Sequence, residues 1–155
     1  MLIKLFINCI FGVNHLSVDF NFISLFGNIY ISMIIGIGTD IVEVLRISKS
    51  IENEAFKIKV FSKNEIAYCE TKVNKAESYA ARFAAKEAFL KALGTGLRGD
   101  IALNQIEVFN NQLGKPSIQL IGKSAQFFVD KKINTIHLSL SHTKQMALAM
   151  VILEA

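Results

Sequence analysis

The longest helix that the sequence predicts, from Glu77 to Leu93, most constrains the fold. The stretch is rich in Ala and free of Gly and Pro, so its backbone strongly favours a helix. Gly94 follows directly, and glycine readily adopts the left-handed conformation that ends a helix. The large apolar side chains that the helix offers to a core are Phe83, Phe89, Leu90 and Leu93. We therefore expect the rest of the chain to pack around this helix.

A β-strand is predicted much earlier, from Ile34 to Val42, where the sequence IIGIGTDIV has a period of two. One face carries Ile35, Ile37, Thr39 and Ile41, and the other carries Gly36, Gly38, Asp40 and Val42. The glycines thin the face of Asp40, so that another segment or a ligand can come close. Asp has a low strand propensity, and Asp40 therefore needs a cation, a hydrogen-bond donor or a special role.

The remaining pattern indicates helices in the first half of the domain and strands in the second. A helix is expected from Val44 to about Glu54, and Ser62 with Glu65 forms a capping box that begins a short helix ending near Glu70. Later segments predict strands at Gln105–Phe109, Ser117–Ile121, His137–Ser141 and Met146–Leu153, with an amphipathic helix at Gly122–Lys132. This order predicts an α+β fold with a mostly antiparallel sheet.

Composition narrows the class of protein. The chain has 155 residues, of which 52% are hydrophobic and 19% charged, as expected for one compact domain with or without an appendage. The net charge of +4 suits an anionic ligand or an acidic partner. No cluster of four or more Lys and Arg occurs, so no nucleic-acid partner is expected. Cys9 and Cys69 lie far apart without a CxxC pattern, which predicts free thiols in a reducing cytoplasm.

Residues 1–32 form an apolar leader in which Lys4 and Asp19 are the only Lys, Arg, Asp or Glu side chains. A signal peptide or membrane anchor has to be considered for such a segment. Its apolar runs are interrupted by polar residues and stay well short of the ~20 residues of a spanning helix, and the ordered regions of a signal peptide are missing. We expect residues 1–32 to lie outside the fold, residues 33–155 to form the domain, and Met33 to be the natural first residue.

Two carboxylates carry the chemistry that we predict. Glu87 and Lys91 are one helical turn apart, and alone they would read as a surface ion pair worth ~0.3–0.5 kcal/mol. Asp40 on the predicted strand and Glu87 on the predicted helix are two carboxylates from separate elements. No His or Cys accompanies them, and oxygen ligands alone favour Mg²⁺ over Zn²⁺. Two ligands suit an ion that also binds water and substrate phosphate. The turn Gly94–Gly96 could contact phosphate only through its backbone N–H groups and a nearby lysine, because a helix C-terminus does not favour anions.

These residues resemble a known family, the bacterial holo-acyl-carrier-protein synthases, which are small single-domain 4′-phosphopantetheinyl transferases. The resemblance runs from Met33 to about Glu154. The motifs that carry it are Gly38–Asp40, Phe83–Lys91, Gly94–Gly96, Asn104–Glu107, Gly114–Pro116 and His137–His142.

The resemblance implies a homotrimer with active sites between subunits, in the cytoplasm and without a membrane partner. It implies transfer of 4′-phosphopantetheine from coenzyme A to a serine of apo-acyl carrier protein, in the service of fatty acid biosynthesis, with adenosine 3′,5′-bisphosphate as the second product. Asp40 and Glu87 would hold Mg²⁺, and with Lys91 they would form the catalytic set. The residues implied in binding coenzyme A are Arg82, Lys86, Lys91, Gly94, Thr95, Gly96, Lys115, Pro116 and His137.

Some points stay open at this level. In the family the first helix carries basic residues that bind the carrier protein; here Arg46 and Lys49 are followed by Glu52 and Glu54, which predicts a weaker or shifted docking surface. The serine proton could pass to a metal-bound water or to a carboxylate such as Glu87. Two other classes of function are a non-catalytic module that binds an acidic helical partner, and a small nucleotide hydrolase that uses the same metal site.

Overall fold

The structure is a computed structural model, and it describes residues 32–94, 96, 101–126 and 131–155. The chain divides into two units, Met1–Ile31 and Ser32–Ala155, and the second contains every element discussed below. That residues 1–32 lie outside the fold stays a prediction, because residues 1–31 are not among the described residues. Among the described residues, no helix is long and apolar enough to cross a membrane.

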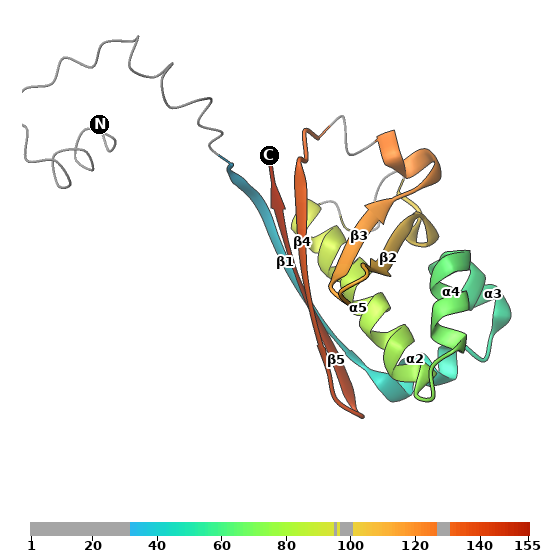
Figure 1. Cartoon of the computed structure of the whole chain (residues 1–155). Helices are drawn as coiled ribbons and strands as arrows, with labels where there is room; N and C mark the ends of the chain where they lie inside the picture. The colour runs from blue at the N-terminus through green and yellow to red at the C-terminus, as the bar shows by residue number, and fades with distance from the viewer. Residues whose placement is uncertain (1–31, 95, 97–100, 127–130) are drawn as a thin grey trace, which may run out of the picture. The chain divides into compact units, whose positions relative to one another are not determined.

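The main sheet has three antiparallel strands in the order β1-β5-β4 (Figure 1). They are β1 (Ile34–Glu43), β4 (Thr135–His142) and β5 (Met146–Glu154). The alternation predicted for β1 is confirmed, since Gly38 and Val42 are buried while Ile37 and Ile41 are exposed. Asp40 therefore lies on the inner face of the sheet, opposite Ala149 of β5.

The helix predicted from Glu77 begins two residues earlier, as α5 (Lys75–Leu93), and ends at Gly94 with the expected left-handed conformation, φ 69°. It packs along the inner face of the sheet against β1 and β5 (Figure 1). The contact depends on the strand glycines. A Cβ at Gly38 would lie 2.0 Å from the carbonyl oxygen of Ala88, and one at Gly36 would lie 2.1 Å from that of Ala92. Only glycine allows the helix backbone this close to the strand.

The helix predicted from Val44 to Glu54 was wrong in extent. The structure has two short helices instead, α2 (Val44–Ser50) and α3 (Glu54–Val60). Asn53 separates them, because its side-chain Oδ1 accepts hydrogen bonds from the backbone N–H groups of Ala55 at 2.9 Å and Phe56 at 3.3 Å. A side chain that caps a new helix competes with continuation of the old one.

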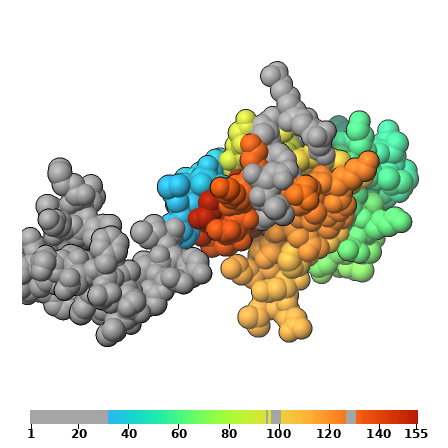
Figure 2. All heavy atoms as spheres, turned by 90° about the horizontal axis from the view of Figure 1, so that it is seen from above, coloured from blue at the N-terminus to red at the C-terminus, as the bar shows by residue number. Residues whose placement is uncertain are grey.

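The capping box at Ser62 and Glu65 is confirmed, and it begins α4 (Lys63–Glu70). The second sheet is a hairpin of β2 (Ile106–Asn110) and β3 (Pro116–Leu120), so the predicted sheet is in fact two antiparallel sheets. The turn of this hairpin projects from the body of the unit, as the light orange segment of Figure 2 shows. Of the helix predicted at Gly122–Lys132, the structure describes a 3₁₀ turn at Gly122–Ser124 and two helical residues after it, while residues 127–130 lie outside the description.

Candidate active site

Asp40 and Lys91 form an ion pair between β1 and α5. The Lys91 Nζ lies 2.8 Å from Asp40 Oδ1 and also donates to the carbonyl oxygen of Thr39 at 3.0 Å. The Asp40 side chain is 16% exposed and that of Lys91 54%. The sequence predicted that Asp40 needs a cation or a donor, and in this structure Lys91 supplies both.

Glu87 lies one helical turn before Lys91 and is half-buried. Its pKa is raised, first by burial and then by the nearby negative charge of Asp40, while Lys91 and Arg46 oppose the shift. The negative charge of Asp40 therefore acts on Glu87, although the two carboxylates come from different elements. Repulsion of this kind is relieved when a cation lies between or beside the two groups.

The donor set at this contact fits a hard divalent ion. Asp40 and Glu87 are both carboxylates, and across the described residues there is no group of three or more His, Cys, Asp and Glu side chains that could hold a metal ion. Two carboxylates suit Mg²⁺, which keeps several waters and takes further ligands from phosphate. The contact of Asp40 with the Lys91 ammonium also shows that this carboxylate accepts a cation.

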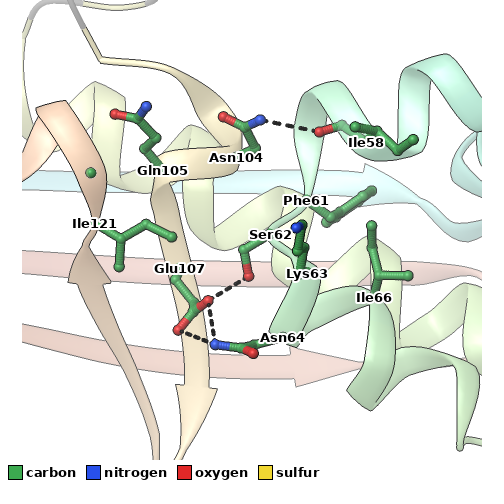
Figure 3. Close-up of a pocket in the computed structure, with 11 residues that line it drawn as sticks. Ile58, Phe61, Ser62, Lys63, Asn64, Ile66, Asn104, Gln105, Glu107 and Ile121 are labelled. Carbon is green, nitrogen blue, oxygen red and sulfur yellow. Dashed lines mark hydrogen bonds between the residues drawn. The ribbon is translucent and has the colours of Figure 1, made fainter.

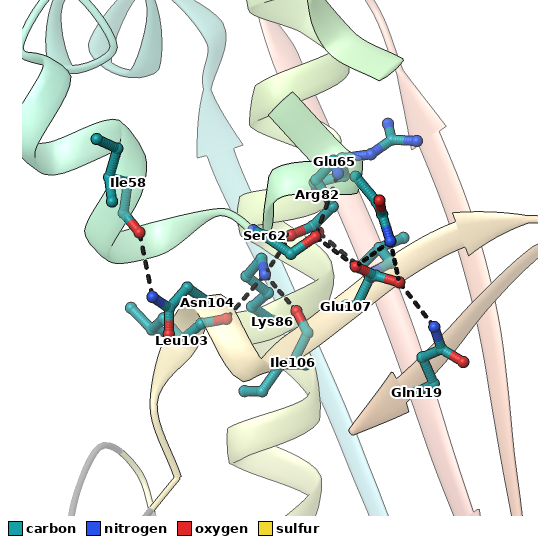
Figure 4. Close-up of polar contacts among 12 residues, drawn as sticks. Ile58, Ser62, Glu65, Arg82, Lys86, Leu103, Asn104, Ile106, Glu107 and Gln119 are labelled. Carbon is teal, nitrogen blue, oxygen red and sulfur yellow. Dashed lines mark hydrogen bonds and ion pairs between the residues drawn. The ribbon is translucent and has the colours of Figure 1, made fainter. Parts of the chain in front are cut away.

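Lys86 belongs to a different cluster, inside the core (Figure 4). Its Nζ lies 2.7 Å from Glu65 Oε2, donates to the carbonyl oxygen of Leu103 at 2.8 Å, and also donates to that of Ile106. Both side chains of the Lys86–Glu65 pair are fully buried. Burial lowers the pKa of Lys86, although Glu65 opposes the shift. The structure thus does not bring Lys86 to Asp40 and Glu87.

Glu107 is a second carboxylate of this buried cluster, and the sequence did not single it out as a functional candidate. Its carboxylate accepts hydrogen bonds from Ser62 Oγ at 2.6 Å and Gln119 Nε2 at 2.7 Å (Figure 4). It also accepts one from the Asn64 side-chain amide at 3.1 Å (Figure 3). Burial alone would raise its pKa, but these hydrogen bonds outweigh it and lower the pKa. The sequence signals that pointed to this region were the capping box at Ser62 and the motif Asn104–Glu107, which contributed to the family resemblance without a role for Glu107.

Arg82 is placed beside the hairpin. Its guanidinium stacks 4.1 Å from the ring of Tyr68 and donates from Nη1 to the carbonyl oxygen of Ser78 and from Nη2 to Asn110 Oδ1. The whole residue is 4% exposed. Among buried side-chain nitrogens and oxygens of the described residues, only Arg82 Nε has no partner. The helix thus directs Arg82 toward β2.

The predicted turn residues lie at the ends of elements. Gly96 has a positive φ of 57°, and Thr95 lies outside the described residues. Lys115 and Pro116 enter β3 from the hairpin turn, where Asn111 Oδ1 accepts a hydrogen bond from the Lys115 backbone N–H at 2.9 Å. His137 is on β4, half-exposed, with Nε2 2.9 Å from Glu154 Oε2.

A cavity of about 680 Å³ lies between the α3–α4 region and β2 (Figure 3). Its walls combine apolar side chains with the amides and hydroxyl that surround Glu107, and none of the predicted site residues lines it. The lining residues are Ile58, Phe61, Ser62, Lys63, Asn64, Ile66, Asn104, Gln105, Glu107, Ile121 and Gly122.

The family model and the similar proteins agree on one family. The sequence model of the 4′-phosphopantetheinyl transferase superfamily matches residues 36–150. The chain is 46% identical over 124 residues to a holo-[acyl-carrier-protein] synthase of Geotalea daltonii, covering 79% of this chain and 99% of that protein.

Two crystal structures of such synthases are also similar. That of Neisseria meningitidis has a TM-score of 0.74 at 34% identity and covers 79% of this chain and 100% of its own. That of Bacillus anthracis, in complex with CoA (3′,5′-ADP), has a TM-score of 0.66 at 37% identity and covers 79% and 98%.

Proposed function

The chain belongs to the holo-[acyl-carrier-protein] synthases of the 4′-phosphopantetheinyl transferase superfamily, and on this premise we propose how its residues carry out the reaction. It is a phosphopantetheinyl transferase, which moves 4′-phosphopantetheine from coenzyme A to a serine hydroxyl of apo-acyl carrier protein. The observation that supports the assignment of residues most directly is the convergence of Asp40, Glu87 and Lys91 where β1 meets α5.

Asp40 and Glu87 are proposed to hold Mg²⁺. Their fit rests on the donor type and on the electrostatic coupling of the two carboxylates. When bound, the ion would neutralise negative charge on the coenzyme A diphosphate. The two carboxylates would fix the position of the ion, since Asp40 is held by a strand of the main sheet and Glu87 by the longest helix.

Lys91 is proposed to contact the phosphate of coenzyme A. Its side chain is 54% exposed at the last turn of α5, so its ammonium can reach a ligand in solvent. Lys86 is enclosed by Glu65 and two backbone carbonyls, and it would have to break these bonds to reach a phosphate. Any contribution of Lys86 to coenzyme A binding would therefore be indirect: its buried hydrogen bonds would hold α5, and with it Lys91, in position.

The family resemblance implies a homotrimer, and we propose that its subunit contact uses the outer face of the main sheet, which is apolar and exposed. Ile37 is 57% exposed and Ile41 59%, and Leu148 and Met150 extend the patch on β5. His137 lies on the same face, since it pairs with Ile152, which also pairs with Ile37. A subunit contact across this face would cover the apolar side chains and put His137 at the interface, as the family resemblance implies. A cytoplasmic role in fatty acid biosynthesis is part of the same proposal.

The experiment that tests the reaction is a mass measurement. Purified protein is incubated with coenzyme A, Mg²⁺ and apo-acyl carrier protein, and the carrier is weighed by mass spectrometry. We expect the carrier to gain one phosphopantetheine group. An unmodified carrier with intact coenzyme A would support a binding module, and cleaved coenzyme A with an unmodified carrier would support a hydrolase.

A further inference from the structure

We propose that Lys91 is the resident counter-cation of Asp40, which competes with the divalent ion for this carboxylate and leaves it for the phosphates of coenzyme A. The metal ion and coenzyme A then strengthen each other's binding. This inference rests on the proposed function, because it takes Asp40 and Glu87 as the metal ligands.

The first observation is the position of the ammonium. Lys91 Nζ contacts Asp40 Oδ1 at 2.8 Å and the Thr39 carbonyl oxygen at 3.0 Å, so two oxygens of β1 already surround this cation. The Asp40 side chain is only 16% exposed, which leaves little of the carboxylate open to solvent. A second cation that approaches Asp40 therefore meets the positive charge of Lys91, and like charges at such distances repel strongly in a partly buried site.

The second observation is that the Lys91 side chain is exposed to solvent whereas that of Lys86 is enclosed by the protein. Lys91 is 54% exposed in the last turn of α5, while Lys86 is fully buried and bonded to Glu65 and two carbonyl oxygens. A long exposed side chain can change rotamer at small cost. Lys91 can therefore exchange one anionic partner for another.

The third observation is the charge balance at the contact. Asp40 and Glu87 repel each other, and Lys91 and Arg46 are the positive charges that act on Glu87. A divalent ion on the two carboxylates would make the Lys91 charge redundant there. Coenzyme A offers Lys91 a new partner, because a diphosphate accepts charge-assisted hydrogen bonds from an ammonium. Coupling of this type is reciprocal, so the ligand that releases Lys91 also strengthens metal binding.

The test measures Mn²⁺ binding by electron paramagnetic resonance, which needs no turnover. Wild type, Lys91→Met and Arg46→Met are titrated with Mn²⁺, each with and without saturating coenzyme A, and a blank of coenzyme A alone corrects for Mn²⁺ bound by the free nucleotide. Arg46→Met is the matched control, because it removes a charge that acts on Glu87 without touching Asp40. Both cations are exposed, so we expect either replacement to leave the buried core unchanged, and circular dichroism checks this.

Without coenzyme A, we expect Lys91→Met to bind Mn²⁺ about fivefold or more tightly than wild type, and Arg46→Met to differ from wild type by much less. Coenzyme A should strengthen Mn²⁺ binding to wild type and Arg46→Met by a similar factor, and Lys91→Met should lose most of this gain. Without coenzyme A, unchanged or weaker Mn²⁺ binding in Lys91→Met would overturn the proposal. Mn²⁺ binding that is tightened as much in Arg46→Met as in Lys91→Met would overturn it as well.

An Asp40→Asn variant separates this inference from the proposed function. If wild type binds Mn²⁺ and Asp40→Asn does not, the metal site stands whatever Lys91→Met shows. If Asp40→Asn binds Mn²⁺ as well as wild type does, the proposed metal site itself fails, and the competition with Lys91 fails with it.

Discussion

Two lysines on α5 lie in different surroundings, and the contrast separates a buried structural cluster from the proposed active site. Lys86 reaches α4 and β2, where the buried cluster of Lys86, Glu65 and Glu107 has every charge enclosed by hydrogen bonds. Lys91 reaches β1, where the open cluster of Asp40, Glu87 and Lys91 remains partly exposed. Five positions along a helix turn the side-chain direction by about 140°, so the two lysines face different neighbours.

The two clusters differ in how their charges are compensated. In the buried cluster, Glu65 accepts hydrogen bonds from the backbone N–H groups of Ser62 and Val108 as well as from Lys86, so it ties α4, β2 and α5 together. In the open cluster, the Lys91 ammonium pairs with Asp40, and the exposed side chains of Lys91 and Arg46 are the positive charges that act on Glu87. Enclosed charges stabilise one arrangement, whereas exposed charges can exchange partners with a ligand.

Removal of Lys86 should have the largest effect. Lys86→Met leaves the Glu65 carboxylate buried without its cation, which should lower the free energy of unfolding by about 3–5 kcal/mol. Urea denaturation measures this, with Lys91→Met as the matched control from the same helix. We expect the control to change the free energy of unfolding by less than about 1 kcal/mol, because the Lys91 ammonium is exposed and water can solvate Asp40 in its place. Equal effects of the two substitutions would contradict the contrast between the clusters.

Neutralising either carboxylate of the open cluster should affect catalysis and spare the fold. Asp40→Asn and Glu87→Gln should each reduce turnover by ~10²-fold or more, because each removes a charge that faces the proposed metal ion. In the same urea experiment, Asp40→Asn should have an unfolding free energy near that of wild type, and that of Glu87→Gln should be slightly higher, because the raised pKa of Glu87 shows that its charge is unfavourable in the fold. Near-normal turnover at saturating Mg²⁺ in either variant would refute the two-carboxylate site.

The glycine contact that brings the open cluster together should be the next most sensitive feature. Gly38→Ala places a Cβ 2.0 Å from the Ala88 carbonyl oxygen, which should cost about 1–3 kcal/mol of stability and move Glu87 away from Asp40. Gly36→Ala is the control, because its clash of 2.1 Å lies one helical turn further on, at Ala92. We expect similar losses of stability from both, measured by thermal unfolding, and a larger loss of turnover from Gly38→Ala. Wild-type stability in Gly38→Ala would show that the strand and helix are not in such close contact.

The smallest expected effect is a difference in pH dependence between two glutamates, measured without metal. The lowered pKa of Glu107 means that its contribution to stability is present above the unfolded value, 4.5, and is lost as the pH falls through the folded pKa. The raised pKa of Glu87 has the opposite sign: its charge destabilises the fold above the folded pKa, and protonation relieves this as the pH falls toward 4.5.

At neutral pH, Glu107→Gln should therefore unfold more easily than wild type and Glu87→Gln less easily. Both differences should shrink in acid, and urea titrations from neutral pH down to about pH 3 would follow them. Two substitutions with the same sign at neutral pH would contradict the assignment of the clusters.

Much of the fold could be predicted from local patterns. The alternation in β1, the capping box of α4 and the glycine end of α5 depend on neighbouring residues, and all three are confirmed. The division of the first predicted helix was missed, although Asn53 carried the signal, because the apolar pattern alone does not reveal a side chain that caps a new helix.

By itself, the sequence determined most of the strands, the start of α4 and the end of α5, and it placed Asp40 on the glycine-lined face of β1. These features depend on residues within a few positions of one another. Only the tertiary structure decided which lysine serves which carboxylate, since Lys86 pairs with a residue 21 positions away and Lys91 with one 51 positions away. The packing of α5 between the main sheet and the β2 hairpin determines these partners, because it buries one helix position among carbonyls and leaves another beside the solvent.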